Sequence, residues 1–160
     1  MISESTRLGL FLAVAIVIAD QATKTWALDV WFFPPRAIEV TSFFNLVAVW
    51  NTGVSFGFLA GESKFMPYIL ASFAATVTIA LVVWLTRVEG KLIAGALGSV
   101  IGGAVGNIID RLRFSAVVDF IDLHVAGFHW PAFNLADSAI TIGVMLVLLD
   151  SFYRRNEEEQ

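Results

Sequence analysis

Long apolar runs separated by short polar stretches dominate the chain, and four of these runs are long enough to cross a membrane. They cover residues of about 8–28, 67–85, 92–109 and 135–152. A hydrocarbon core of ~30 Å takes roughly 20 helical residues to span. The first run is too long for a signal peptide, contains Asp20 and Lys24, and has no small-residue cleavage site after it. We therefore predict four retained transmembrane helices.

Residues at the ends of these runs agree with helix boundaries. Pro67 suits the first turn of the second helix. The polar residues 86–91 form a tight turn, so the second and third helices should make an antiparallel hairpin. Asn134 can cap the fourth helix. Glycines spaced as small-xxx-small in the third run predict close approach of neighbouring helices, and they include Gly98, Gly102 and Gly106.

Two long loops, about 29–66 and 110–134, separate the apolar runs. Residues 36–40 and 43–50 are β-prone and aromatic, which predicts a small sheet. Residues 57–60 begin a short amphipathic stretch suited to a membrane surface. Aromatic residues at the end of the first run predict an interfacial belt made of Trp26, Trp31, Phe32 and Phe33.

The pattern as a whole predicts the fold class. We expect an all-α membrane protein, a single domain over 1–160, with four transmembrane helices, a small extracytoplasmic β-sheet and a surface amphipathic helix.

Composition supports a membrane protein and removes several other classes. The chain is 58% hydrophobic and only 15% charged, with a mean hydropathy of +0.77, whereas a soluble domain has about 25% charged residues. The ten Lys and Arg residues are scattered, which excludes a nucleic-acid surface. The chain has no cysteine, so disulfides, thiol catalysis and thiolate metal sites are excluded.

An even number of spans places both termini on one side of the membrane. Five Lys or Arg residues fall on each side, but those on the side of the termini lie closest to the helix ends. This density favours cytoplasmic termini and outward-facing long loops.

Polar residues inside the apolar runs are the first candidates for chemistry. Asp20 and Lys24 share a helix face, either as an ion pair with Lys24 extending to the headgroups or as an anchor below an active site. Asn107, Asp110 and Arg111 also share a face. They suit a cluster that bonds the last helix carbonyls, or a wall that orients substrate carbonyls.

Four further residues lie next to the predicted membrane surface. Asn51 and Gly53 follow a predicted strand, where Asn51 can close a turn or bond a substrate backbone. Asp137 can complete a capping box with Asn134, and Asp119 can be one solvent-facing acid of an alternating strand. The two aspartates fall at the same predicted depth, however, and two nearby carboxylates can share one proton.

Metal and serine chemistry are weakly supported. His124 and His129 could bind a metal with Asp119 and Asp122, but their spacing matches no compact ligand motif. Ser138 adjoins Asp137, yet no base is placed by sequence to activate it.

Five ordered motifs together resemble bacterial lipoprotein signal peptidase, also called signal peptidase II. These motifs are residues 20–24, residues 51–53 with Phe56, residues 102–107 with Asp110 and Arg111, residues 118–120, and residues 133–137. Each motif alone is weak, but the five occur in order and cover nearly the whole chain.

The resemblance implies an aspartic endopeptidase of the bacterial inner membrane with its active site at the periplasmic face. Its substrate would be a prolipoprotein whose cysteine carries diacylglycerol, cut just before that cysteine. The family's catalytic pair corresponds to Asp119 and Asp137. The supporting positions correspond to Asp20, Lys24, Asn51, Gly53, Asn107, Asp110, Arg111, Asn134 and Ala136. The resemblance implies no metal and no cofactor, membrane lipids as surroundings, no nucleic acid, and a monomer.

Three other classes remain open on the residues alone. A small transporter or proton-conducting subunit could use Asp20, Lys24 and Asn107 as a polar path. A scaffold could bind a partner helix through its glycine faces. A metal-dependent membrane protease is the remaining alternative.

Overall fold

In the computed structural model, residues 2–53 and 65–158 are described, and they contain four long helices and four strands. The helices are α1 (Glu4–Trp31), α2 (Met66–Leu85), α3 (Lys91–Phe114) and α4 (Leu135–Glu158). All four are long and apolar enough to cross a membrane. The prediction of four spans is confirmed, although α1, α3 and α4 extend several residues past the apolar runs. Helices continue into flanking polar residues because capping groups, rather than hydropathy, end them.

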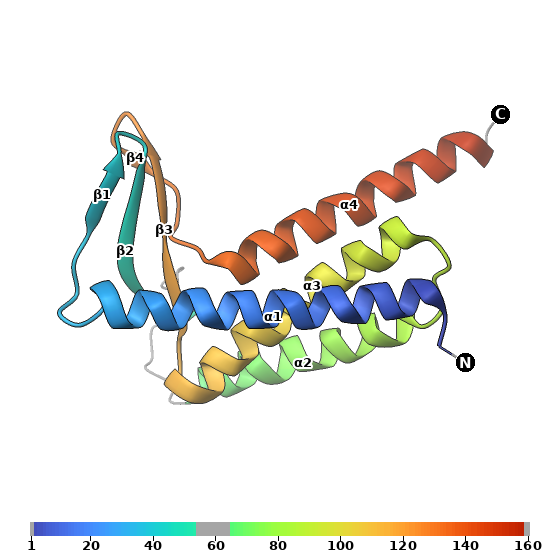
Figure 1. Ribbon diagram of the computed structural model, residues 1–160, viewed down its shortest axis with the longest axis horizontal. Coiled ribbons are helices and arrows are strands. Elements are labelled where there is room, and N and C mark those ends of the chain that lie inside the picture. The colour runs from blue at the N-terminus through green and yellow to red at the C-terminus, as the bar shows by residue number, and fades with distance from the viewer. Residues whose placement is uncertain (1, 54–64, 159–160) are drawn as a thin grey trace.

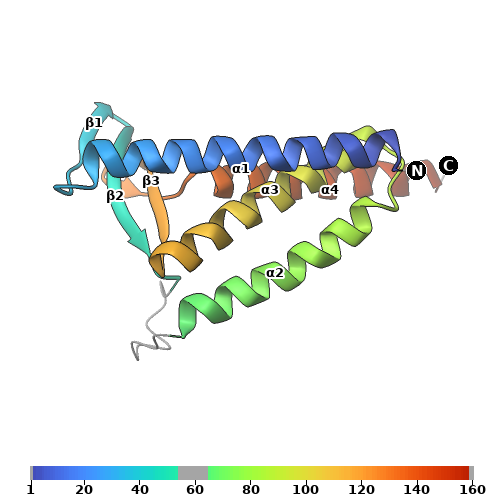
Figure 2. The ribbon, with the colours of Figure 1, turned by 60° about the horizontal axis from the view of Figure 1, so that its bottom comes forward.

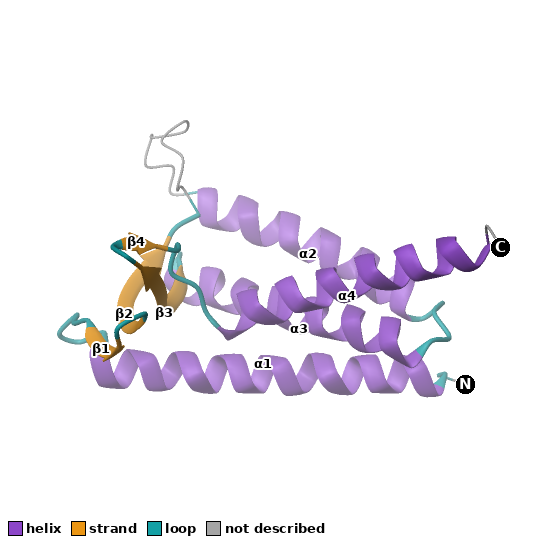
Figure 3. Ribbon diagram, turned by 90° about the horizontal axis from the view of Figure 1, so that it is seen from above, coloured by secondary structure: helices purple, strands orange, loops and turns teal. Residues whose placement is uncertain are grey.

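The central helix of the bundle is α3, which contacts α1, α2 and α4 (Figures 1 and 3). Small residues make this position possible. A Cβ added at Gly98 would meet the backbone of Gly9, and one added at Gly102 would meet the backbone of Ala13. The small-xxx-small prediction is therefore confirmed as a packing surface between α1 and α3.

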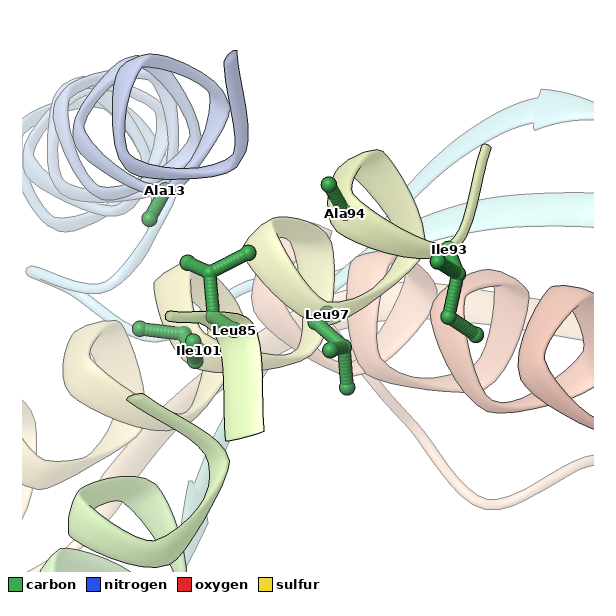
Figure 4. Packing of buried hydrophobic residues seen from close by; sticks show 6 residues of the cluster. All are labelled: Ala13, Leu85, Ile93, Ala94, Leu97 and Ile101. Carbon is green, nitrogen blue, oxygen red and sulfur yellow. The ribbon is translucent and has the colours of Figure 1, made fainter. Parts of the chain in front are cut away.

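A core of aliphatic side chains closes the end of the bundle that carries the termini. Leu85 at the end of α2 packs against Ala13 of α1 and against α3, as Figure 4 shows. The α3 contributions are Ile93, Ala94, Leu97 and Ile101. The tight turn between α2 and α3 brings these residues together, so the predicted helical hairpin is confirmed.

A four-stranded antiparallel sheet lies at the opposite end of the bundle from the termini (Figure 1). Its order is β1 (Ile38–Thr41), β2 (Phe44–Asn51), β3 (Val117–Val125) and β4 (Phe128–His129). The two strands predicted in the first long loop are confirmed. β3 and β4 come from the second long loop, and β2 pairs with β3 over most of its length. The sheet therefore joins the two loops into one unit.

The aromatic residues at the end of α1 divide into two groups. Trp26 and Phe33 are exposed, as an interfacial belt requires. Trp31 and Phe32 are fully buried against Val118 and Phe120 of the sheet, so the belt prediction is wrong for these two residues. Their burial attaches the sheet to α1, and the Trp31 indole also donates to the Val47 carbonyl at 3.0 Å. Figure 2 shows β2 and β3 beside the end of α1.

The predicted surface amphipathic helix around residues 57–60 lies outside the described residues, as does Phe56.

Candidate active site

The two candidate aspartates reach one point from different elements. Asp119 is in β3 and is almost fully buried, whereas Asp137 is in the first turn of α4 and is partly buried. The chain passes from β3 through β4 to the start of α4, so the sheet end of the bundle holds both carboxyl groups (Figure 1). The common depth predicted for the pair agrees with this arrangement.

Asn134 connects the two aspartates. Its Nδ2 donates to Oδ1 of Asp119 at 2.7 Å, and its backbone N–H donates to Oδ2 of Asp137 at 3.2 Å. In return, the N–H of Asp137 donates to Oδ1 of Asn134 at 2.9 Å. The predicted helix cap and capping box are therefore confirmed. Because the same asparagine binds both carboxylates, capping α4 also fixes the geometry of the pair.

Asn51 holds the second oxygen of Asp119. Its Nδ2 donates to Oδ2 of Asp119 at 2.8 Å, while its Oδ1 accepts from the N–H of Gly53 at 2.8 Å. Gly53 has a φ of 81°, a left-handed conformation that glycine adopts without a steric penalty. The turn predicted here is confirmed, and this turn aims the Asn51 amide at the aspartate.

Asn107 of α3 holds the other side of the pair. Its Nδ2 donates to Oδ1 of Asp137 at 2.8 Å. Its Oδ1 accepts from Lys24 at 2.9 Å and from Asn134 at 3.3 Å. These acceptor contacts fix the orientation of the amide, so its nitrogen points to Asp137.

A buried ionic cluster lies beneath the pair. The Lys24 ammonium is 2.9 Å from Asp20 and 2.9 Å from Asp110, and all three side chains are at most 2% exposed. The predicted contact of Asp20 with Lys24 is present. Lys24 does not extend to the headgroups, so that interpretation is wrong: the two carboxylates and the Asn107 oxygen take up its three donors.

The two carboxylates of this cluster each bind the residue that precedes a candidate catalytic aspartate. Asp20 accepts from the N–H of Ala136 at 3.0 Å, directly before Asp137. Asp110 accepts from the N–H of Val118 at 3.0 Å, directly before Asp119. One lysine therefore organises the backbone on both sides of the site. Ala136 therefore takes part in the site through its backbone N–H, although its side chain has no functional group.

Gln21 belongs to the same cluster and is absent from the residues predicted by sequence. Its Nε2 donates to Asp110 at 3.0 Å and to Asp20 at 3.2 Å. The sequence feature that could have indicated this role is a polar amide next to an aspartate inside an apolar run.

Arg111 supplies positive charge near the pair. It is half-buried on α3, its guanidinium donates to the Asn107 carbonyl at 3.4 Å, and it interacts electrostatically with both Asp119 and Asp137. The predicted contact of this cluster with a helix carbonyl is present. The guanidinium also has further donors that can orient a carbonyl group.

Burial, with a smaller contribution from the nearby charge of Asp137, raises the pKa of Asp119 to about 6, even though hydrogen bonds from Asn51 and Asn134 lower it. A carboxyl group with this pKa still holds a proton in roughly a tenth of the molecules at pH 7, far more often than an ordinary aspartate does. Close like charges of this kind are the condition for two carboxyl groups to share one proton.

A mostly apolar cavity of about 460 Å³ opens beside Asp137. It lies between the β3–β4 region and α4, with Leu123, Trp130, Phe133, Ser138, Thr141 and Ile142 around it. The Ser138 hydroxyl donates to the Asn134 carbonyl at 3.0 Å.

The histidines take part in a separate contact. His129 lies 2.9 Å from Asp122, which also accepts from Asn45, and His124 stacks on His129. Within residues 2–53 and 65–158, no three His, Asp or Glu side chains are grouped so as to hold a metal ion.

Comparisons with known proteins identify the family of this chain. A model of the signal peptidase (SPase) II family matches residues 12–153. The chain is 46% identical to a lipoprotein signal peptidase of Nitrobacter hamburgensis in an alignment of 153 positions that covers 92% of this chain and 93% of the relative. It is 45% identical to a lipoprotein signal peptidase of Rhodopseudomonas palustris, over 91% of this chain and 92% of that protein.

Solved structures show the same fold. A bacterial membrane enzyme determined by the in meso method at 2.3 Å resolution superposes with a TM-score of 0.76 and 30% identity. The superposition covers 95% of this chain and 91% of that enzyme. A second bacterial membrane enzyme, determined at 1.9 Å resolution, has a TM-score of 0.75 and 32% identity, over 89% of this chain and 90% of that one.

Proposed function

The chain belongs to the signal peptidase II family, and from this premise we propose that it is an aspartic peptidase whose catalytic pair is Asp119 and Asp137. It is a membrane protein that removes signal peptides from prolipoproteins. The observation that carries the proposed catalytic type is the pair itself. Two carboxyl groups at one end of the bundle are both bound by Asn134, and one of them has a raised pKa.

The proposed reaction needs one proton shared by the pair. The ionised carboxylate takes a proton from a water molecule, and the water oxygen forms a bond to the scissile carbonyl carbon. The protonated carboxyl donates to the developing oxyanion. The carbon–nitrogen bond then breaks, and the leaving amine receives a proton from the pair. The products are a carboxylic acid and a free amine, and no acyl-enzyme forms.

The supporting residues fall into two groups. Asn51, Asn107 and Asn134 donate to the carboxylates and set which oxygens face the substrate. Arg111, which interacts with both aspartates, is the proposed group for holding a substrate carbonyl. Asp20, Lys24 and Asp110 hold the backbone before each aspartate, and Gly53 allows the turn that places Asn51. The second group positions the first and does not contact the substrate.

The proposed substrate is a prolipoprotein whose cysteine already carries diacylglycerol, cut just before that cysteine. The cavity beside Asp137 supports this substrate because its walls are mostly apolar and continue onto α4, a candidate membrane span. A lipid-bearing residue held at the surface of the bilayer could therefore place its amide at the pair.

We also propose a bacterial inner membrane location, with both termini in the cytoplasm and the pair at the periplasmic face. The termini lie at one end of the bundle and the sheet with Asp119 at the other, which supports opposite sides for the two (Figure 1). A protease applied to sealed spheroplasts tests this orientation, since a tag at residue 160 should be cut only after lysis. A monomer is sufficient for this proposal, because every group it uses comes from one chain.

The deciding experiment compares purified Asp119→Asn and Asp137→Asn with wild type on a diacylated precursor, scored by gel mobility. Asp150→Asn is the matched control, because it lies on the same helix as Asp137 at the far end of the bundle. We expect both dyad variants to lose turnover by on the order of 10⁴-fold with an unchanged helical circular dichroism spectrum, and the control to remain active. Normal turnover by a dyad variant would reject the aspartic mechanism.

A further inference from the structure

The hairpin made by β3 and β4 is amphipathic at the end that lies away from Asp119. Val125 pairs with Phe128, and the backbone N–H of Trp130 donates to the Leu123 carbonyl at 2.8 Å. Residues directly opposite in an antiparallel pair project to the same side, as do residues two apart on one strand. Leu123, Val125, Phe128 and Trp130 therefore share one side, which we call the apolar hairpin face.

The apolar hairpin face is uncovered. Its four side chains are between 40% and 72% exposed, and they line a shallow hollow of about 390 Å³ together with Phe43 and His124. A monomer in water rarely leaves aromatic side chains gathered in this way, so the face is a candidate contact surface.

Beyond Phe120, which packs against α1, the opposite side of the same sheet is polar. Asp122 accepts from Asn45 at 2.9 Å and lies 2.9 Å from His129. Glu39 pairs with Asn45 in the neighbouring strand and is exposed. A sheet with one apolar and one polar side is suited to a boundary between water and an apolar phase, as an amphipathic interfacial helix is.

The position of the sheet relative to the helices indicates which phase its apolar side meets. The strands run across the end of the bundle, while the helices extend away from the sheet in one direction (Figures 1 and 3). Leu123 and Trp130 also line the cavity beside Asp137, whose opposite wall is Thr141 and Ile142 of α4. The apolar hairpin face is therefore continuous with the outer surface of a helix that is long and apolar enough to span the membrane.

We propose that the apolar hairpin face rests in the boundary between headgroups and acyl chains of the bilayer, and that phospholipid covers it. Trp130 is suited to this depth because tryptophan favours the membrane interface. β3 connects the face to the active site: Val125 lies six residues from Asp119, roughly 20 Å along the strand. The lipid contact thereby sets the height of Asp119 relative to the membrane surface.

The test uses the full chain in lipid nanodiscs with one fluorophore on one cysteine. The natural sequence has no cysteine, so Val125→Cys and Glu39→Cys each carry a single thiol. Val125 is on the apolar hairpin face, and Glu39, the matched control, is on the polar side. Two quenchers are compared: phosphatidylcholine with a nitroxide near the top of its acyl chain, and iodide in the water.

We expect the nitroxide lipid to quench the Val125 label several-fold more than the Glu39 label, and iodide to show the reverse preference. Equal quenching of both labels by iodide, without any excess from the nitroxide lipid at Val125, would overturn the proposal. Protection of Val125 from both quenchers would overturn it as well, because a protein, either a second copy or a partner, would then cover the face.

A second measurement tests the consequence for Asp119 and rests on the proposed function. Val125→Asp with Phe128→Asp is compared with Val125→Leu with Phe128→Leu. We expect the aspartate pair to lower turnover of a precursor embedded in vesicles, and to spare a short lipopeptide presented in detergent. Equal losses with both substrates would overturn the depth-setting role. The quenching experiment needs no activity, so its outcome is independent of the peptidase proposal.

Discussion

Asn134 and Asp137 hold each other by two reciprocal hydrogen bonds, in which the backbone N–H of each donates to the side chain of the other at 3.2 and 2.9 Å. This arrangement is a helix cap, and it is also half of the candidate active site, because the Asn134 amide continues to Asp119 at 2.7 Å. A structural and a catalytic interpretation of Asp137 are therefore compatible. The helix end that the cap stabilises is the frame on which the pair is held.

Replacing Asn134 by serine separates these two roles. Serine caps a helix about as well as asparagine, but it has no amide to donate to Asp119. We expect the free energy of unfolding of Asn134→Ser to be within about 1 kcal/mol of the wild-type value. Its turnover should fall by about 10- to 100-fold, which corresponds to the loss of one hydrogen bond to a charged group. Thermal unfolding in detergent and the rate of precursor cleavage measure the two effects.

Asn134→Ala is the comparison for this variant, because alanine removes both the cap and the amide. It should lose turnover to a similar extent and also lose about 0.5–2 kcal/mol of stability. Full activity of Asn134→Ser would show that the Asn134–Asp119 bond has no part in catalysis.

The pH dependence of turnover should reflect the pKa of Asp119, which burial raises to about 6. The proposed reaction needs one proton on the pair, so kcat/KM should fall as the pH rises through about 6 and that proton is lost. Asn51 donates to the charged form and lowers this pKa. Asn51→Ala removes that donor, so the pKa rises and the alkaline limb of the profile should move to higher pH.

Asn45→Ala is the matched control for the pH experiment, because Asn45 also lies in β2 but donates to Asp122 instead of Asp119. Its alkaline limb should stay in the wild-type position. A limb that stays in place or moves to lower pH in Asn51→Ala would contradict the assignment of this proton to the pair.

Close packing of α1 on α3 gives a prediction about stability. A side chain at Gly102 would meet the backbone of Ala13, so Gly102→Leu should force the helices apart and cost about 1–3 kcal/mol or more. Gly95→Ala on the same helix is the control, because its Cβ meets only a flexible Leu12 methyl group at 3.3 Å. In thermal unfolding, Gly102→Leu should unfold at a clearly lower temperature than Gly95→Ala. Equal stability would mean that the glycine contact does not limit the approach of α1.

Much of the fold was predictable because it depends on local pattern. Run length predicted the four spans, and two stretches of β-prone and aromatic residues predicted β1 and β2. The capping preference of Asn134 placed the start of α4. Each of these signals is contained within a few neighbouring residues, so no knowledge of distant contacts was needed.

What the sequence did not show depends on contacts between distant segments. Lys24 finds Asp110 and Asn107 more than eighty positions away, and nothing local indicates that these groups remove it from the headgroups. Trp31 and Phe32 were expected at the interface because aromatic residues at a span end usually lie there. Pairing of β2 with β3 brings a second loop over them. Gln21 likewise finds its partner Asp110 only through the packing of α1 on α3, 89 positions along the chain.

The buried ionic cluster gives the sharpest prediction about the support of the site. Lys24 is shared by Asp20 and Asp110, each at 2.9 Å and all buried. Lys24→Met fills a similar volume but leaves two buried carboxylates without their cation. We therefore expect it to lower the free energy of unfolding by about 3–5 kcal/mol, the cost of breaking a buried ion pair. Lys91→Met is the matched control, because its pair with Glu4 is exposed and such pairs contribute about 0–1 kcal/mol.

A triple variant tests whether charge is the cause of that loss. Asp20→Asn, Lys24→Met and Asp110→Asn together leave no buried charge in the cluster, so stability should recover in part relative to Lys24→Met alone. Turnover should not recover, because asparagine is a weaker acceptor than a carboxylate for the N–H groups of Ala136 and Val118, which precede the pair. Thermal unfolding and precursor cleavage are measured on the same preparations. If Lys24→Met unfolds no earlier than Lys91→Met, the cluster does not stabilise the fold, and its position beneath the aspartates needs another explanation.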